Sequence, residues 1–232
     1  DLHLTLAPGQ RIELRAADQR RPLVELVTSC IIRGAPDAEL MVNGLLVIGT
    51  AIRLENPVPG RVLFRHCSLV EPAHDACVLV NGAPAATGNL VFEHCIIGSL
   101  RLPANGCQLT VCDSIIDAGS DTAYALAASA AGGAGPPGIL HAVTVLGQLH
   151  VKSMTLASEV ICTGTVTVEE RGHGCVRFSA LPDVSVTPPQ YECIRTQAGE
   201  MARWFTSRQY GQPAYCQLAP LCPPVVRTGA SD

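Results

Sequence analysis

A repeated pattern of short alternating segments constrains this chain more than any other feature. Six stretches each combine alternating apolar positions, two or three polar or small residues, and two or three aliphatic residues: ELMVNGLLVIG (39–49), RVLFRHCSLVE (61–71), NLVFEHCIIGS (89–99), QLTVCDSIIDA (108–118), GILHAVTVLGQ (138–148) and KSMTLASEVIC (152–162). One residue of each stretch is taken as equivalent: Gly44, Cys67, Cys95, Ser114, Val143 and Glu159. These residues are separated by 23, 28, 19, 29 and 16 positions. Period-2 alternation bounded by turn-forming residues predicts strands, and strands recurring at such intervals predict a solenoid.

We therefore predict an all-β fold for residues 1–170, a right-handed parallel β-helix (solenoid) of roughly seven turns at about 4.8 Å per turn. Stacking would place Gly44, Cys67, Cys95 and Ser114 in an internal ladder, where a thiol packs like a methyl-sized apolar group. A β-sandwich would need more hairpin signals than the two Asn-Gly pairs at 43–44 and 81–82. The Ala-, Gly- and Pro-rich stretch 123–138 is interpreted as a loop or insertion.

The pattern fades after VICTGTVTVEE (160–170), and the rest of the chain is rich in proline and lacks alternation. The end of a solenoid exposes unpaired strand edges and an open core, which need a cover. We predict that residues 171–232 form an irregular C-terminal cap over that end. Within the cap, 200–211 is expected to supply a short helix and 218–229 an extended segment.

Composition excludes several classes of protein. The net charge is −4 and no Lys/Arg run marks a nucleic-acid surface. No apolar run reaches the roughly 18 residues of a membrane helix. No signal peptide opens the sequence, and we expect a segment of a longer protein. Aromatic residues make up only 4%, so the core must consist of aliphatic residues, Ala and Cys.

The eleven cysteines are odd in number and include no C-x2-C pair. Their spacing argues against zinc ribbons, iron–sulfur clusters and thioredoxin-like motifs. The favoured interpretation is mostly free, buried thiols in a reducing compartment, which places the protein in the cytoplasm or assembled into a particle. A disulfide-rich secreted domain is the alternative.

Carboxylates and one histidine are the candidates for catalysis. Asp113, Asp117 and Asp121 lie four residues apart, and on a strand the first two would share a face suited to a calcium-assisted lyase. Such a lyase also needs a basic side chain, and none lies between Arg101 and Lys152. His173, in RGHGC, lacks the paired carboxyls that hydrolysis of a sugar bond requires. We interpret Asp113, Asp117 and His173 as turn residues and predict no catalytic site.

Metal ligands and an outward ladder are the remaining candidates. His173, Cys175 and Cys193, with a fourth ligand from Cys216 or Cys222, match no compact zinc module, so no metal or cofactor is predicted. Two dipeptides occupy equivalent places in successive turns, Arg65-His66 and Glu93-His94. They predict an outward polar ladder that could contact sugar.

The tail carries two blocks that identify a resemblance. The first block matches at Gly174, Cys175, Val176, Arg177, Phe178, Ser179, Thr187, Pro188, Tyr191 and Cys193. The second matches at Phe205, Thr206, Ser207, Tyr210, Gly211, Pro213, Tyr215, Gln217, Leu218, Cys222 and Pro223. With these motifs the chain resembles a family of uncharacterised bacterial β-helix proteins, similar to accessory components of phage-tail-like or injection particles. The resemblance implies a β-helix whose partners are other protein domains or particle components, with a glycan as a further candidate.

The tail is also interpreted physically as a clamp. Arg177, Tyr191, Tyr210 and Tyr215 can bury ring faces and the guanidinium stem while their polar tips stay paired, and we predict that they seal the end of the solenoid. Two functional hypotheses result. The first is a non-enzymatic structural or binding module, and the second is a carbohydrate-active enzyme that uses the solenoid surface as a polysaccharide groove.

Overall fold

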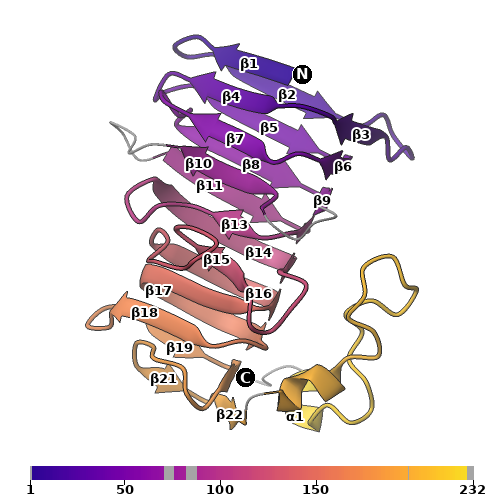
Figure 1. Ribbon diagram of the computed structural model, residues 1–232, viewed down its shortest axis with the longest axis vertical. Helices are drawn as coiled ribbons and strands as arrows, with labels where there is room; N and C mark the ends of the chain where they lie inside the picture. Colours follow the sequence, from indigo (N-terminus) through magenta and orange to yellow (C-terminus); the bar gives the residue numbers. More distant parts are fainter. Residues whose placement is uncertain (1, 71–75, 82–87, 198, 229–232) are drawn as a thin grey trace.

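The computed structural model describes residues 2–70, 76–81, 88–197 and 199–228. The chain winds into coils that stack along one axis, with the N-terminal coil at the top of Figure 1 and the last coil at the bottom. Each coil passes through three strand positions, and each position forms a ladder of parallel strands. The expected fold class, an all-β parallel β-helix, is confirmed.

The first ladder runs through β1 (Leu2–Leu6), β4 (Cys30–Gly34), β7 (Ile52–Glu55), β10 (Val78–Asn81), β13 (Leu100–Arg101), β15 (Tyr124–Ala127), the start of β17 (Gln148–Cys162) and β18 (Val166–Glu170). The second runs through β2 (Arg11–Arg15), β5 (Glu39–Asn43), β8 (Arg61–Arg65), β11 (Gly88–Glu93), β14 (Cys107–Asp117), β16 (Gly138–Leu146), β17, β19 (Cys175–Arg177) and β21 (Gln190–Tyr191). The third runs through β3 (Leu23–Leu26), β6 (Leu46–Gly49), β9 (Ser68–Val70), β12 (Ile96–Ile97), the ends of β14, β16 and β17, β20 (Ala180–Pro182) and β22 (Ile194–Thr196).

The solenoid is longer than the sequence predicts. The second ladder has nine members, so the described chain forms nine coils where roughly seven were expected. The two extra coils come from β18 to β22, which pair in parallel as far as Thr196. The predicted boundary between 170 and 171 is therefore too early. Among these, β19 to β22 have only two or three residues, which is too short for alternation to be detected in the sequence.

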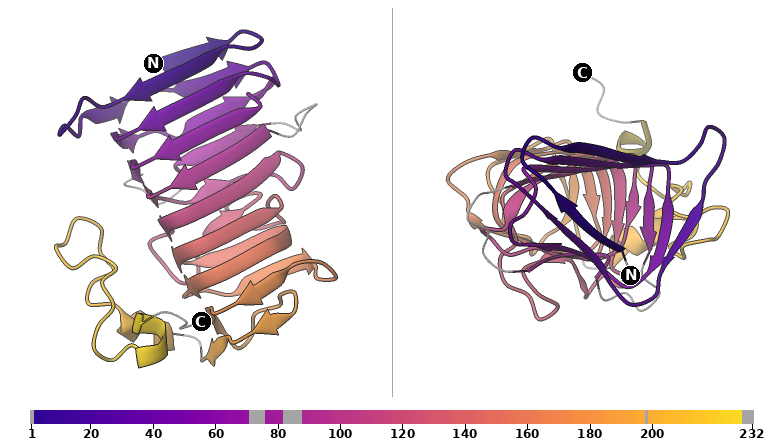
Figure 2. Two further views of the ribbon diagram at one scale, coloured as in Figure 1. Left: turned by 180° about the vertical axis from the view of Figure 1, so that it is seen from behind. Right: turned by 90° about the horizontal axis from the view of Figure 1, so that it is seen from above.

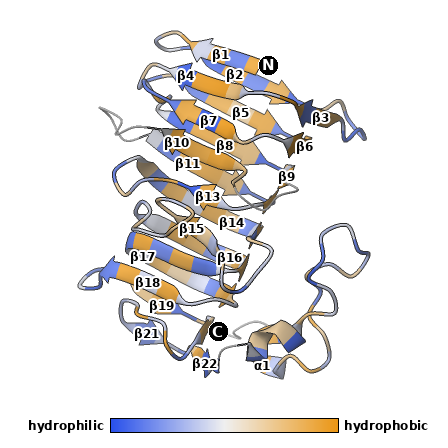
Figure 3. Ribbon diagram, viewed as in Figure 1, coloured by the Kyte–Doolittle hydropathy of each residue, from blue (hydrophilic) through white to orange (hydrophobic). Residues whose placement is uncertain are grey.

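The core lies inside the coils and results from the period-2 alternation. In β5, Leu40 and Val42 are buried while their neighbours are half-buried, and the hydropathy colours alternate along the strands in Figure 3. Phe64 and Phe92 stack inside successive coils with ring centroids 5.2 Å apart, and both are fully buried. Aliphatic side chains fill the remaining positions, as the low aromatic content requires.

The stretch 123–138 is only partly a loop. Tyr124–Ala127 forms β15, and β16 begins at Gly138, so the insertion is limited to 128–137. Its tip is a tight turn closed by backbone hydrogen bonds between Ser129 and Gly132. The sequence YALA shows no alternation of polar and apolar residues, because three of its four residues are small or aliphatic.

The tail after Thr196 packs beside the lower coils and does not lie over the end of the solenoid (Figures 1 and 2). It contains a 3-10 helix, η1 (Glu200–Trp204), and a short helix, α1 (Pro224–Thr228), where an extended segment was predicted. Met201 and Trp204 are buried against outward residues of the coils, including Leu146 and Ala180. The predicted cap is thus a lateral cover. Neither helix of the described residues has the length or the apolar run that crossing a bilayer requires.

Candidate functional site: an outward row at one corner of the coils

One corner of every coil from the second onward places a residue in the left-handed region of backbone conformation. Gly44 has φ +77°, and the residues at the same corner of the later coils have φ between +47° and +59°. These residues are His66, His94, Asp113, Ala142, Glu159, Phe178 and Glu192. The corner joins the second and third strand positions, so its outward side chains form a column parallel to the solenoid axis.

The residue after each corner points inward. This inner column consists of Leu45, Cys67, Cys95, Ser114, Val143, Val160, Ser179 and Cys193. The ladder predicted from the sequence is therefore correct at Cys67, Cys95 and Ser114 but wrong by one position at Gly44, which lies on the corner itself. Among the residues taken as equivalent, Val143 is also inward, whereas Glu159 is off by one position and lies on the corner.

Hydrogen bonding explains why cysteine and serine recur in the inner column. The Cys67 and Cys95 thiols donate to the carbonyl two residues earlier, each at 3.2 Å, and Ser179 donates to Arg177 at 2.7 Å. The Arg65 and Glu93 carbonyls also accept backbone hydrogen bonds, from the N–H groups of Gly44 and His66, each at 3.0 Å. The short donor side chain therefore adds a second hydrogen bond to a carbonyl that has two lone pairs. Small volume alone does not account for the choice of residue.

The outward row begins with two matched pairs in the third and fourth coils. Arg65 donates through Nε to Glu93 Oε2 at 2.8 Å, and the His66 and His94 rings stack with centroids 5.0 Å apart and an interplanar angle of 6°. His94 Nδ1 lies 4.0 Å from Asp113 Oδ2 in the next coil. The outward polar ladder predicted from the two dipeptides is present.

The row continues toward the last coil with a second His–carboxylate pair and an aromatic pair. His141 Nε2 lies 3.8 Å from Glu159 Oε1. The Phe178 and Tyr191 rings meet edge to face at 5.7 Å, and the Arg177 guanidinium lies 5.8 Å from the centre of the Phe178 ring. We call the outward set the corner row: Arg65, His66, Glu93, His94, Asp113, His141, Glu159, Arg177, Phe178, Tyr191 and Glu192.

The predicted catalytic residues do not converge. Asp113 lies on the corner row, Asp117 accepts a hydrogen bond from the tail, and His173 is an exposed residue of the turn before β19. No hydrogen bond or ion pair between any two of these described residues is present. The solvated-turn interpretation fits the exposed His173. It is incomplete for Asp117, which accepts a hydrogen bond from the Gly119 N–H in its own turn at 2.7 Å but also binds a tail residue 98 positions away.

The predicted clamp divides into two parts. Tyr215 donates to Asp117 at 2.8 Å and packs edge to face on Tyr210, with centroids 5.5 Å apart, which fastens the tail to the side of the coils. Arg177 and Tyr191 instead belong to the corner row, and Tyr191 is 59% exposed. The sealing of the end that was predicted for these four residues is not found.

Asp121 supplies the second attachment of the tail. Its carboxylate binds the Arg208 guanidinium through two hydrogen bonds, one of 2.9 Å, and also accepts from Thr163. Burial by itself would raise the pKa of Asp121, but the hydrogen bonds from Arg208 and Thr163 outweigh it and hold that pKa below its usual value. No sequence pattern indicates this contact, because 87 residues separate the partners.

Within the described ranges the cysteines form no metal-ligating cluster, and most are buried thiols. Cys67 differs in acidity, because a hydrogen bond with the Cys95 thiol lowers the pKa of Cys67 to about 7, but its side chain is only 1% exposed. All eleven lie among the described residues, none forms a disulfide, and seven are buried. Burial raises the pKa of Cys30 to about 11 and those of Cys107 and Cys162 to about 12, so these thiols stay protonated at neutral pH. No group of three or more His, Cys, Asp or Glu within the described ranges could hold a metal ion.

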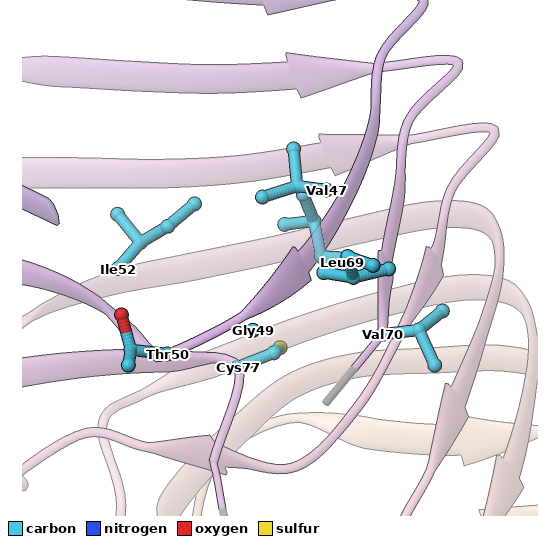
Figure 4. Close-up of a pocket in the computed structure, with 8 residues that line it drawn as sticks. Val47, Gly49, Thr50, Ile52, Leu69, Val70 and Cys77 are labelled. Carbon is cyan, nitrogen blue, oxygen red and sulfur yellow. The ribbon is translucent and has the colours of Figure 1, made fainter. Parts of the chain in front are cut away.

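Two hollows in the described chain carry no acid–base chemistry. One is a small open hollow beside Val47, Gly49, Thr50 and Leu69, and Figure 4 shows the aliphatic side chains with the Thr50 hydroxyl and the Cys77 thiol. The other is a narrow gap within the later coils, too small for a water molecule, and is lined by Leu, Val, Met and Ala side chains with Thr187. Neither provides the pair of carboxyls that glycoside hydrolysis requires.

Comparisons of the chain with protein-family models, with curated proteins and with solved structures find no match. The function of the corner row must therefore be inferred from its geometry and chemistry.

Proposed function

We propose that this chain is a non-enzymatic β-helical binding module whose corner row contacts a hydroxyl-rich polymer, a glycan, without cleaving it. The tail motifs further suggest a place within a larger bacterial protein or a phage-tail-like assembly, in contact with other domains or particle components. The rigid stack of coils supports this proposal because it holds side chains from successive coils about 4.8 Å apart along a line.

The observation that carries the proposal is the set of side chains kept at a strained backbone position. A left-handed conformation costs a residue other than glycine roughly 1 kcal/mol or more, and the cost is greatest for bulky residues such as Phe178. From the second to the ninth coil of the described chain, glycine occupies this corner only at Gly44. Strained residues concentrate at functional sites, where the side chain offsets the cost.

The chemistry of the row suits a neutral glycan better than a polyanion. It carries four carboxylates, Glu93, Asp113, Glu159 and Glu192, against two guanidinium groups. Carboxylates and imidazoles accept and donate hydrogen bonds to hydroxyl groups, and the exposed Tyr191 ring offers an apolar face to a sugar. A polyanion would meet net like charge along the row.

Native gel electrophoresis in gels that contain a soluble neutral polysaccharide tests this function. We expect dextran, galactomannan or a mixed-linkage glucan to retard the protein, and alginate or pectate to leave its mobility unchanged. Tyr191→Ala should weaken retardation about tenfold, which corresponds to about 1.4 kcal/mol. Tyr210→Ala is the matched control, because Tyr210 is also an exposed tyrosine but lies in the tail.

Two results would contradict the proposal. Equal loss of binding in Tyr191→Ala and Tyr210→Ala would show that binding does not depend on the corner row. Sustained release of reducing ends or unsaturated products, abolished by Asp113→Asn or Asp117→Asn, would favour the carbohydrate-active enzyme instead.

A further inference from the structure

The outward positions of the third ladder are mostly apolar. In register down this ladder, one outward column contains Leu46, Ser68, Ile96, Ile115, Thr144, Ile161, Ala180 and Ile194. The residues that follow Ile96 and Ile115 in sequence, Ile97 and Ile116, are fully buried in the core, so this column lies on the other face of the strands. Parallel strands that are apolar on both faces are normally covered on both.

Other parts of the chain cover this column above and below its middle. In the third coil, the Arg21 guanidinium donates to Ser68 Oγ, and Ser68 is fully buried. In the seventh to ninth coils, the tail packs on Ile161, Ala180 and Ile194, beside the lower coils in Figure 1. The chain itself therefore shows that apolar groups bind to this face.

The apolar cluster of the tail does not extend to the fourth, fifth and sixth coils of the described chain. There the column consists of Ile96, Ile115 and Thr144, which are all half-buried. We call these three residues the shelf. Successive members of the shelf lie about 4.8 Å apart along the axis, as paired strands do.

The shelf adjoins the corner row. Ile96 follows His94 by two residues, Ile115 follows Asp113 by two residues, and the residue between them points inward in both cases. The Asp113 side chain is 49% exposed, so its carboxylate can accept a hydrogen bond from a ligand. A hydrogen-bond acceptor and an apolar surface thus lie side by side. A simple hexose offers hydroxyl groups to the first but no apolar substituent to the second.

We propose that the shelf is a subsite for the acetamido group of an N-acetylated amino sugar, which rests on the proposed function and names the class of glycan that the corner row binds. The acetamide N–H donates to the Asp113 carboxylate, and the acetamide methyl group packs on Ile96 and Ile115. Because the acetamido group is uncharged, it brings no net charge to a row with more carboxylates than guanidinium groups. A free amino sugar lacks the methyl group, and a hexose lacks both parts.

Isothermal titration calorimetry with two matched oligosaccharides tests the proposal. The β-1,4-linked hexamers of N-acetylglucosamine and of glucose share their linkage and differ only in the substituent at carbon 2. We expect the acetylated hexamer to bind about fourfold more tightly or better, because one buried methyl group contributes about that factor. The glucosamine hexamer controls for charge, since binding through its ammonium groups should weaken as salt is added.

Substitutions on two faces of the coils make the test specific to the shelf. Replacing both shelf isoleucines, Ile96→Thr with Ile115→Thr, should lower the ratio of the two affinities to below about twofold. Thr144 shows that the fold accepts threonine in this column. Ile31→Thr is the matched control, because Ile31 is a half-buried outward isoleucine of β4 on the first ladder, and it should keep the wild-type ratio. Circular dichroism checks that each variant keeps its β structure.

The outcomes separate this proposal from the proposed function. Equal affinity for the acetylated and glucose hexamers overturns the acetamido subsite while neutral glycan binding stands. A ratio that the double variant leaves at its wild-type value, or that Ile31→Thr lowers equally, also overturns the subsite. Failure of both neutral hexamers and of the neutral polysaccharides to bind overturns the proposed function together with it.

Discussion

The inner and outer columns of the corner lie one residue apart in sequence, yet they obey different rules. Inside, Cys67, Cys95 and Val143 are all buried, so the core restricts the volume and polarity of these side chains, and the two thiols also donate to backbone carbonyls. Outside, His66 and His94 share only their backbone conformation with Ala142. The fold therefore specifies the inner column and leaves the outer one available for contact with a partner.

The largest expected effect on the free energy of unfolding comes from a substitution in the core inside the coils. Phe92→Ala should lower the free energy of unfolding by about 3–5 kcal/mol, because it removes a fully buried ring that stacks on Phe64 and leaves a cavity between coils. Its neighbour Val91 is half-buried and points outward, so Val91→Ala should cost less than about 1 kcal/mol. Urea denaturation followed by circular dichroism measures both, and equal costs would mean that the core is not where the coils place it.

A substitution of intermediate expected effect lies on the outer surface of the coils, where the tail packs. Asp121→Asn should destabilise docking of the tail by about 1–3 kcal/mol, because it leaves the half-buried Arg208 without its ionic partner. Trp204 is the only tryptophan and is buried in this contact, so its fluorescence reports docking separately from the coils. A red shift at a denaturant concentration where the circular dichroism is still native is the expected result.

The same contact has a defined pH dependence. Because the pKa of Asp121 is held below its usual value, the carboxylate stabilises the docked tail at neutral pH. That stabilisation is lost as the pH falls below about 4 and through the pKa of the folded state. The Trp204 signal of the wild type should show this acid transition and that of Asp121→Asn should not. An unchanged transition in the variant would contradict the assignment.

The smallest expected effect comes from an outward residue of the corner, compared with the inward residue that follows it. His94→Ala should change the free energy of unfolding by no more than about 0.5 kcal/mol, because the side chain is mostly exposed and Ala142 adopts the same backbone conformation. Cys95→Ala, one residue later, should cost about 1 kcal/mol through lost packing and a lost donor. Thermal unfolding of the two variants side by side measures the difference, and the reverse order would refute the distinction between the columns.

Much of the fold could be predicted from residues 39–162. Alternation at a period of two and the recurrence of Cys67, Cys95 and Ser114 predicted strands, coils and most of one ladder correctly. The one-residue offset of Gly44 and Glu159 from the inner column could not be predicted. A left-handed corner residue leaves neither a gap nor a recognisable motif in a single sequence. The last two coils were missed for a related reason, since strands of two or three residues are too short to show a period.

The corner row was only half predictable. The dipeptides Arg65-His66 and Glu93-His94 indicated it, and the alignment of the six stretches places His141 at the equivalent of Arg65 and includes Glu159 within one position. Nothing in the sequence around Phe178 indicates that it shares this line. Its alignment depends on the register of coils with unequal loops.

What the sequence determined by itself is the local rule: which residues alternate, where small donors recur, and hence that the chain forms stacked strands. Only the tertiary structure decided which distant residues meet, such as Asp117 with Tyr215 and Asp121 with Arg208. It also decided that the tail packs on a side of the coils and not over the end of the solenoid. The reason is physical: strand periodicity is encoded in neighbouring residues, whereas contacts across about 90 residues depend on the accumulated register of every coil between them.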